Sequence, residues 1–187
     1  MSHRIVILAS GSGTLAQAIF DAPELDIEIV ALISDVANAP VLERAKLIGI
    51  HTQTIELGGS RQLWNKEIIE AVAGYRADLV VSAGFMRILP ADFVNRFPTI
   101  NSHPALLPDF PGAHAVRDAL AAGVTVTGTT VHWVDDGVDT GPIITQMEVP
   151  VLPHDDEAVL HERIKKVERG LIVATIALIL PTLERNV

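Results

Sequence analysis

Apolar residues along this 187-residue chain fall into short continuous runs that alternate with segments of helical spacing. Short runs rich in β-branched residues are typical of buried strands, whereas apolar spacings of three and four residues indicate amphipathic helices. Before Gly123, the pattern predicts strands at Ile5–Ala9, Ile27–Ile33, Thr52–Ile55, Leu79–Ser82 and Thr99–Ser102. It predicts the intervening helices at Thr14–Phe20, Val41–Leu47, Gln62–Val72, Ala91–Asn95 and Ala113–Ala121.

This alternation of strand and helix predicts an α/β domain built on a parallel sheet. The segments Ile5–Ala9 and Leu79–Val81 are apolar at every position, as expected of strands whose two faces are both covered by helices. After Gly123, two strand-like segments, Val124–Val134 and Ile143–Val149, flank a loop and predict a β extension of the sheet.

A final helix is predicted over Asp156–Leu180. It begins with acidic residues, which suit the positive end of a helix dipole, and its apolar stripe should face the sheet. The stripe consists of Leu160, Ile164, Val167 and Leu171. Because no repeat or linker interrupts the chain, we expect one Rossmann-like domain over residues 1–187, with a mostly parallel central sheet, helices on both faces and a C-terminal helix.

Composition excludes several classes of protein. With 49% hydrophobic residues and 20% charged residues, the chain is not intrinsically disordered. A formal net charge of −9 argues against nucleic acid and anionic membranes as partners. The absence of cysteine fits a reducing compartment, and no secretory signal is visible, so we expect a cytoplasmic protein. Leu171–Leu180 is shorter than the roughly 20 apolar residues that span a bilayer.

A glycine loop lies between the first predicted strand and helix. Gly11-Ser12-Gly13-Thr14-Leu15-Ala16 follows the pattern G-x-G-x-x-A, which lets backbone N–H groups at a helix start approach a phosphate. Asp35 has the spacing of the acidic residue that binds the ribose of a dinucleotide. It could equally be a turn or helix-cap residue, so the loop alone does not identify the ligand.

A second set of candidate polar residues lies at the end of the strand predicted at Thr99–Ser102. Asn101 and His103 are two residues apart and project from the same face of an extended strand. With Asp139 from a glycine-flanked loop, they suggest acyl transfer without a covalent intermediate or a metal. The amide would hold an oxyanion, the imidazole would move protons, and the carboxylate would favour the imidazolium. The remaining histidines are expected to be structural or exposed, namely His3, His51, His114, His132, His154 and His161.

Several segments together resemble the folate-dependent phosphoribosylglycinamide formyltransferase family. They are Gly11–Thr14, Ala83–Leu89, Asn101–Pro108 (Asn-Ser-His-Pro-Ala-Leu-Leu-Pro) and Asp135–Pro142. The resemblance covers nearly the whole chain and implies the formyltransferase fold. It implies that the amine of glycinamide ribonucleotide takes the formyl group of 10-formyltetrahydrofolate in de novo purine biosynthesis, with no metal, and that both partners are small molecules.

The resemblance also implies roles for individual residues. Asn101, His103 and Asp139 would be catalytic. The N-terminal part would bind the ribonucleotide and the C-terminal part would bind folate and carry out catalysis. The ribonucleotide would contact Gly11, Gly13, Thr14, Leu15 and Glu168; Leu15 departs from the Asn that is common in the family. Folate would contact Arg61, Met86, Arg87, Ile88, Leu89, Asn101, Asp135, Asp136, Gly137, Val138 and Asp139.

Two alternatives stay open at this point. A 10-formyltetrahydrofolate hydrolase would use similar residues but let water attack the formyl group. A nucleotide- or NAD-binding protein of the Rossmann type would instead use the glycine loop and Asp35. The chain is expected to be a monomer or a homodimer.

Overall fold

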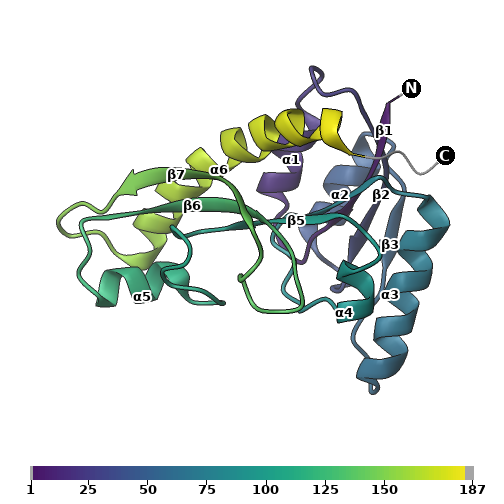
Figure 1. The fold of residues 1–187 in the computed structure, drawn as a ribbon, viewed down its shortest axis with the longest axis horizontal. Helices are drawn as coiled ribbons and strands as arrows, with labels where there is room; N and C mark the ends of the chain where they lie inside the picture. Colours follow the sequence, from purple (N-terminus) through teal and green to yellow (C-terminus); the bar gives the residue numbers. More distant parts are fainter. Residues whose placement is uncertain (1, 184–187) are drawn as a thin grey trace.

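The computed structural model describes residues 2–183, which form a seven-stranded sheet flanked by helices (Figure 1). The strands are β1 (His3–Leu8), β2 (Ile27–Ser34), β3 (Thr52–Thr54), β4 (Leu79–Ser82), β5 (Thr99–His103), β6 (Val126–Trp133) and β7 (Ile143–Pro150). The helices are α1 (Thr14–Phe20), α2 (Pro40–Leu47), α3 (Arg61–Tyr75), α4 (Ala91–Val94), α5 (Ala115–Ala121) and α6 (Glu157–Ile179), and a 3-10 turn follows at Leu180–Thr182.

The sheet has the order β3-β2-β1-β4-β5-β6-β7. The first five strands in this order are parallel, whereas β6 pairs antiparallel with β5, and β7 pairs antiparallel with β6. The predicted α/β architecture with a β extension is therefore confirmed. Element boundaries differ by a few residues; for example, β5 continues to His103 and α3 to Tyr75.

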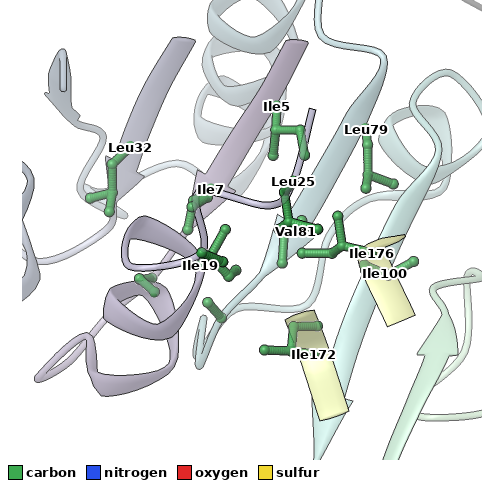
Figure 2. Close-up of a cluster of buried hydrophobic side chains, with 14 of the residues drawn as sticks. Ile5, Ile7, Ile19, Leu25, Leu32, Leu79, Val81, Ile100, Ile172 and Ile176 are labelled. Carbon is green, nitrogen blue, oxygen red and sulfur yellow. The ribbon is translucent and has the colours of Figure 1, made fainter. Parts of the chain in front are cut away.

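Two apolar cores cover the two faces of the sheet. Alternate residues of β1 enter opposite cores: Ile5 and Ile7 point to one, and Val6 and Leu8 to the other. The first core, shown in Figure 2, packs the sheet against α1, α2 and the second half of α6. The second packs it against α3 and α4. This double coverage explains why β1 and β4 lack the apolar–polar alternation of half-exposed strands.

Helix α6 begins with a side-chain cap, because Asp156 Oδ1 accepts a hydrogen bond from the backbone N–H of Val159 at 2.8 Å. Its first half buries Leu160 and Ile164 against Val116 and Val149, so this part of the stripe contacts α5 and β7. Its second half runs beside α1 and belongs to the first core (Figure 1). None of the described helices is long and apolar enough to cross a membrane.

The parallel strands direct their carboxyl ends, and the loops that follow them, to one edge of the sheet. The loops after β1, β4 and β5 meet at this edge, where ligands bind in open α/β sheets. The loop between β6 and β7 and one side of α6 reach the same place. Segments that are far apart in the sequence are thus brought to one cleft.

Candidate active site

The cleft at this edge has a volume of about 600 Å³. It is lined by residues 11–15 after β1, residues 82–89 after β4 and residues 101–104 at the end of β5. The loop between β6 and β7 contributes Asp135, Gly137, Val138 and Asp139, and α6 contributes His161, Lys165 and Glu168. A continuous cavity of this size is large enough for a small organic ligand.

The glycine loop lies at one end of the cleft. Gly13 precedes α1 with a positive φ of 75°, and a Cβ at this position would lie 2.3 Å from Val41 Cγ2, so the turn requires glycine. No side chain caps the first N–H groups of α1, which leaves them for a ligand. Leu15, in the first turn of α1, is partly buried and packs its side chain against the first core. The loop therefore offers backbone donors to an anion.

Asn101 and His132 face each other across the antiparallel pair of β5 and β6, because the register places them opposite one another. Asn101 Nδ2 lies 3.3 Å from His132 Nε2, and His132 Nδ1 donates to the carbonyl of Trp133 at 2.8 Å. The Asn101 amide thus places one of its two N–H groups against this ring. The second N–H of the Asn101 amide is then available to a ligand.

His103 and Asp139 lie beside each other in the cleft. His103 Nδ1 lies 3.3 Å from Asp139 Oδ2, and His103 Nε2 donates to the carbonyl of Phe110 at 2.8 Å. Asp139 Oδ1 lies 3.5 Å from His132 Nε2. Because a carboxylate and a carbonyl only accept hydrogen bonds, a His103 ring that carries both protons satisfies both neighbours.

Asp139 stays ionised in this setting. Burial raises the pKa of its carboxyl group. Three contacts act in the opposite direction and outweigh burial: a hydrogen bond from His132, one from the backbone N–H of Gly112, and the nearby His103. The net effect is a pKa below the ordinary value. A permanent negative charge therefore lies beside the imidazole of His103.

Tight backbone packing holds the loop that carries Asp139. A Cβ on Gly141 would lie 1.8 Å from the carbonyl oxygen of Trp133, so the loop can pass β6 only with glycine there. Asp135 Oδ1 accepts hydrogen bonds from Gly137 N–H at 3.1 Å and from Thr140 Oγ1 at 2.8 Å. These contacts make the loop a defined wall of the cleft.

Glu168 is buried on α6, with 7% of its surface exposed. Ser102, which lies between Asn101 and His103 on β5, donates its hydroxyl to Glu168 Oε1 at 2.9 Å. Burial raises the pKa of Glu168, and the hydrogen bond from Ser102 offsets part of this effect. Lys165 and His161 line the same wall, and burial lowers the pKa of His161. This side of the cleft thus combines a buried acid with a cation.

The loop after β4 also lines the cleft, and a polar contact from Arg61 holds it. Met86 and Ile88 expose apolar side chains, 70% and 59% respectively. Arg61 lies outside the cleft lining, and its guanidinium donates to the carbonyl of Ile88 and stacks over Trp64. Asp136 is also outside the lining.

Asp35 lies in the bend that follows β2, as the turn interpretation expected, and the structure does not support the other two roles considered from the sequence. Its buried carboxylate accepts hydrogen bonds from Ser10 Oγ and from Arg87 Nε, at 2.5 and 2.6 Å, so it is not free for a ribose hydroxyl. It is not the cap of α2 either, because Ala39 holds that position. Within residues 2–183, no cluster of three or more His, Asp or Glu side chains is arranged to hold a metal ion.

Comparison with known proteins identifies the family. The family model described as formyl transferase matches residues 3–176. The chain belongs to the formyl transferase family. It is 51% identical over 180 residues to phosphoribosylglycinamide formyltransferase of Mycobacterium tuberculosis H37Rv, covering 93% of this chain and 83% of the relative. It is 41% identical over 174 residues to the Escherichia coli K12 protein of the same name, covering 89% and 82%.

Solved structures agree with this assignment. The crystal structure of glycinamide ribonucleotide transformylase 1 from Symbiobacterium toebii matches with a TM-score of 0.90 and 41% identity, covering 94% of this chain and 86% of that chain. The corresponding protein from Geobacillus kaustophilus matches with a TM-score of 0.91 and 36% identity, covering 96% and 100%. This formyl transferase therefore shares its whole architecture with glycinamide ribonucleotide transformylases.

His132, which we expected to be structural or exposed, is buried with 2% of its surface exposed, and it contacts both Asn101 and Asp139. His161 also lines the cleft, as does Lys165, which the sequence did not single out. The signal for His132 was its place on an alternating strand. Its partner, however, depends on the register between β5 and β6, which the sequence pattern does not specify.

Proposed function

We propose that this enzyme transfers the formyl group of 10-formyltetrahydrofolate to the amine of glycinamide ribonucleotide, the activity named in its relatives. The observation that supports the site assignment is the convergence of Asn101, His103 and Asp139 beside a loop of free backbone donors in one cleft. A water-attacking hydrolase and a dinucleotide-binding protein are not favoured by these relatives.

The ribonucleotide phosphate is proposed to bind the loop Gly11–Leu15. This loop offers backbone N–H groups at the start of α1, and Lys165 adds a local cation to a chain of net charge −9. Glu168, on the same wall as Lys165, would accept hydrogen bonds from the ribose or the glycinamide. Leu15 would contribute its backbone N–H and not its side chain.

Folate is proposed to lie along Met86–Leu89, with the pterin against the loop Asp135–Asp139. The apolar side chains of Met86 and Ile88 suit a flat heterocycle, and the backbone groups of both segments can pair with its polar edge. Arg87 also lines the cleft. Arg61 and Asp136 would contact only portions of the folate that extend beyond the cleft, such as its glutamate tail, which carries carboxylates.

The proposed reaction proceeds through a tetrahedral adduct. The amine nitrogen forms a bond to the formyl carbon, and the carbonyl electrons move to the formyl oxygen. The free N–H of Asn101 stabilises this oxyanion. The Nε2–H of His103 does so once it exchanges the Phe110 carbonyl for the formyl oxygen, and Asp139 stabilises the imidazolium. The carbon–N10 bond then breaks, while the proton lost by the amine passes to N10 of tetrahydrofolate. His103, at 3.3 Å from Asp139, gives its proton to N10 as this bond breaks and takes the amine proton in exchange, so the ring ends in the state in which it began.

We further propose a division of labour in which the N-terminal part holds the phosphate and the C-terminal part supplies the catalytic group and most of the folate contacts. The enzyme is proposed to act in the cytoplasm as a monomer or a homodimer. Sedimentation at micromolar concentration distinguishes these two states, and fractionation of the source cells tests the location.

Incubation of the purified enzyme with glycinamide ribonucleotide and 10-formyltetrahydrofolate tests the activity. We expect stoichiometric formylglycinamide ribonucleotide and tetrahydrofolate, detected by mass spectrometry. Tetrahydrofolate with free formate and no formylated ribonucleotide would instead indicate a hydrolase. Formation of neither product would contradict the proposal.

A further inference from the structure

The carboxylate of Asp35 joins parts of the cleft that the reaction above does not connect. It follows β2, and 1% of its side chain is exposed. It accepts a hydrogen bond from Ser10 Oγ at 2.5 Å through Oδ1, and one from Arg87 Nε at 2.6 Å through Oδ2. Each oxygen thus holds a different loop. No step of the proposed formyl transfer uses this group.

Ser10 belongs to the ribonucleotide side of the cleft, since it directly precedes Gly11. Its backbone N–H donates to the carbonyl of Gly84 at 3.1 Å. Its hydroxyl accepts a hydrogen bond from the N–H of Met86 at 2.8 Å while donating to Asp35. The glycine loop and the loop after β4 are therefore joined both directly and through Asp35.

Arg87 belongs to the folate side. Its side chain is 37% exposed and lines the cleft, while its Nε is turned to Asp35. A carboxylate buried as deeply as that of Asp35 is costly unless it is paired, so the arrangement with both partners in place is strongly preferred. One buried charge thus fixes the positions of two loops.

We propose that Asp35 is a positioning residue that holds the ribonucleotide loop and the folate loop in register with each other. This inference rests on the proposed function for the identity of the two substrates. Asp35 touches neither substrate and acts through Ser10 and Arg87. When the link is lost, substrate binding must itself order the loops, so the cost is seen in both KM values, whereas kcat changes little.

Asp35→Asn tests this directly, because it keeps the shape of the side chain and removes its charge. We expect the KM for glycinamide ribonucleotide and the KM for 10-formyltetrahydrofolate to rise together, each about tenfold, with kcat within about threefold of wild type. Glu28→Gln is the matched control. Glu28 forms an exposed ion pair with Arg4 at 3.0 Å, away from the cleft, and its loss should leave all constants unchanged.

Arg87→Met separates the link from direct folate contact. It leaves Asp35 buried without its cation, so the KM for the ribonucleotide should rise about tenfold although Arg87 lies on the folate side. The double variant Asp35→Asn, Arg87→Met removes both charges. We expect its ribonucleotide KM to stay about tenfold above wild type, as in each single variant, because the two substitutions break the same link.

Amide hydrogen exchange of residues 10–15 without substrate tests the same link independently of turnover. Exchange should be about tenfold faster in Arg87→Met and unchanged in Glu28→Gln.

Wild-type KM values in these variants, together with unchanged exchange, would overturn the proposal, as would a rise in the folate KM alone. If wild-type enzyme makes no product, the proposed function fails and the exchange experiment still decides the link. If Asp35→Asn does not fold, Ser10→Ala removes only the hydroxyl and should raise the ribonucleotide KM.

Discussion

At the scale of single residues, His103 lies between an anionic acceptor and a neutral one. Asp139 Oδ2 and the Phe110 carbonyl lie at 3.3 and 2.8 Å from its two ring nitrogens. Because both neighbours accept hydrogen bonds, this arrangement orients the ring. It suits a group that first stabilises an oxyanion and then transfers a proton.

His103→Ala should lower kcat by about 10²- to 10⁴-fold, because a positioned acid–base group contributes that much to proton transfer. Both KM values should stay within about threefold of wild type, since the ring is not proposed to carry substrate binding. Steady-state kinetics measures the effect. His51→Ala changes an exposed histidine beside Tyr75, outside the cleft lining, and serves as the control. A kcat within a few-fold of wild type in His103→Ala would contradict the assigned role.

Glu168 should affect both the pH dependence of folding stability and the binding of the ribonucleotide. Burial raises its pKa in the folded enzyme, so between the unfolded and folded pKa values the native state binds the extra proton, and stability falls as pH rises through this window. Glu168→Gln removes that dependence while keeping an oxygen for the hydroxyl of Ser102. We expect the variant to be more stable than wild type near pH 7.5 and equally stable below the unfolded pKa.

Thermal unfolding at several pH values measures this difference, and the KM for glycinamide ribonucleotide should rise in the same variant. Glu162→Gln, at an exposed position on the same helix, should leave both quantities unchanged. A melting temperature of Glu168→Gln that follows the wild-type value across the pH range would show that Glu168 does not carry a raised pKa.

The sequence made Asn101 and His103 candidates through their shared strand face and Asp139 through its glycine-flanked loop, whereas Glu168 was a candidate only through the family resemblance. It could not identify the partners of Asp35 or of His132. Asp35 meets Arg87 only because β2, β1 and β4 are neighbours in the sheet. His132 meets Asn101 only because of the register between β5 and β6. Both contacts are properties of the assembled sheet, not of a local pattern.

At the scale of elements, prediction from sequence is more complete. Strands β1 and β4 are apolar on both faces, and α6 carries a long stripe, so their type and approximate bounds follow from local physics. The direction in which β6 pairs does not follow from its composition, since an alternating strand fits a parallel or an antiparallel neighbour. The loop that brings Asp139 to His103 depends on that direction.

Gly141→Ala should displace the loop between β6 and β7. The added Cβ would lie 1.8 Å from the Trp133 carbonyl, so the loop must move and carry Asp139 away from His103. We expect kcat to fall at least about tenfold, because misplacement of about 1 Å costs up to 10²-fold. The control is Gly74→Ala in α3, where nothing lies within 4 Å of the new methyl group and where Ala stabilises a helix by about 0.5–1 kcal/mol. Unchanged activity in Gly141→Ala would show that the loop tolerates the shift.

At the scale of the whole molecule, the sheet separates two apolar cores, and the cleft lies at the edge where its parallel strands end. Ile172 on α6 is fully buried between the sheet and α1 (Figure 2). Ile172→Ala should lower the free energy of unfolding by about 2–5 kcal/mol, measured by urea titration, and Ile172→Val by about 0.5–1.5 kcal/mol. Both KM values at 25 °C should match wild type. A loss of substrate affinity in Ile172→Val would show that the core and Glu168 are more tightly coupled than the packing suggests.

The antiparallel pair β6 and β7 has a consequence for divergence among relatives. These strands and the loop between them form one uninterrupted stretch, 126–150, and among the described strands β7 pairs with β6 alone. The segment 126–150, which carries Asp139, is thus a continuous unit whose main contacts with the rest of the protein are with β5 and α6. A chimaera that receives this segment from a relative should have the relative's KM for the folate substrate. It should keep the recipient's KM for the ribonucleotide substrate.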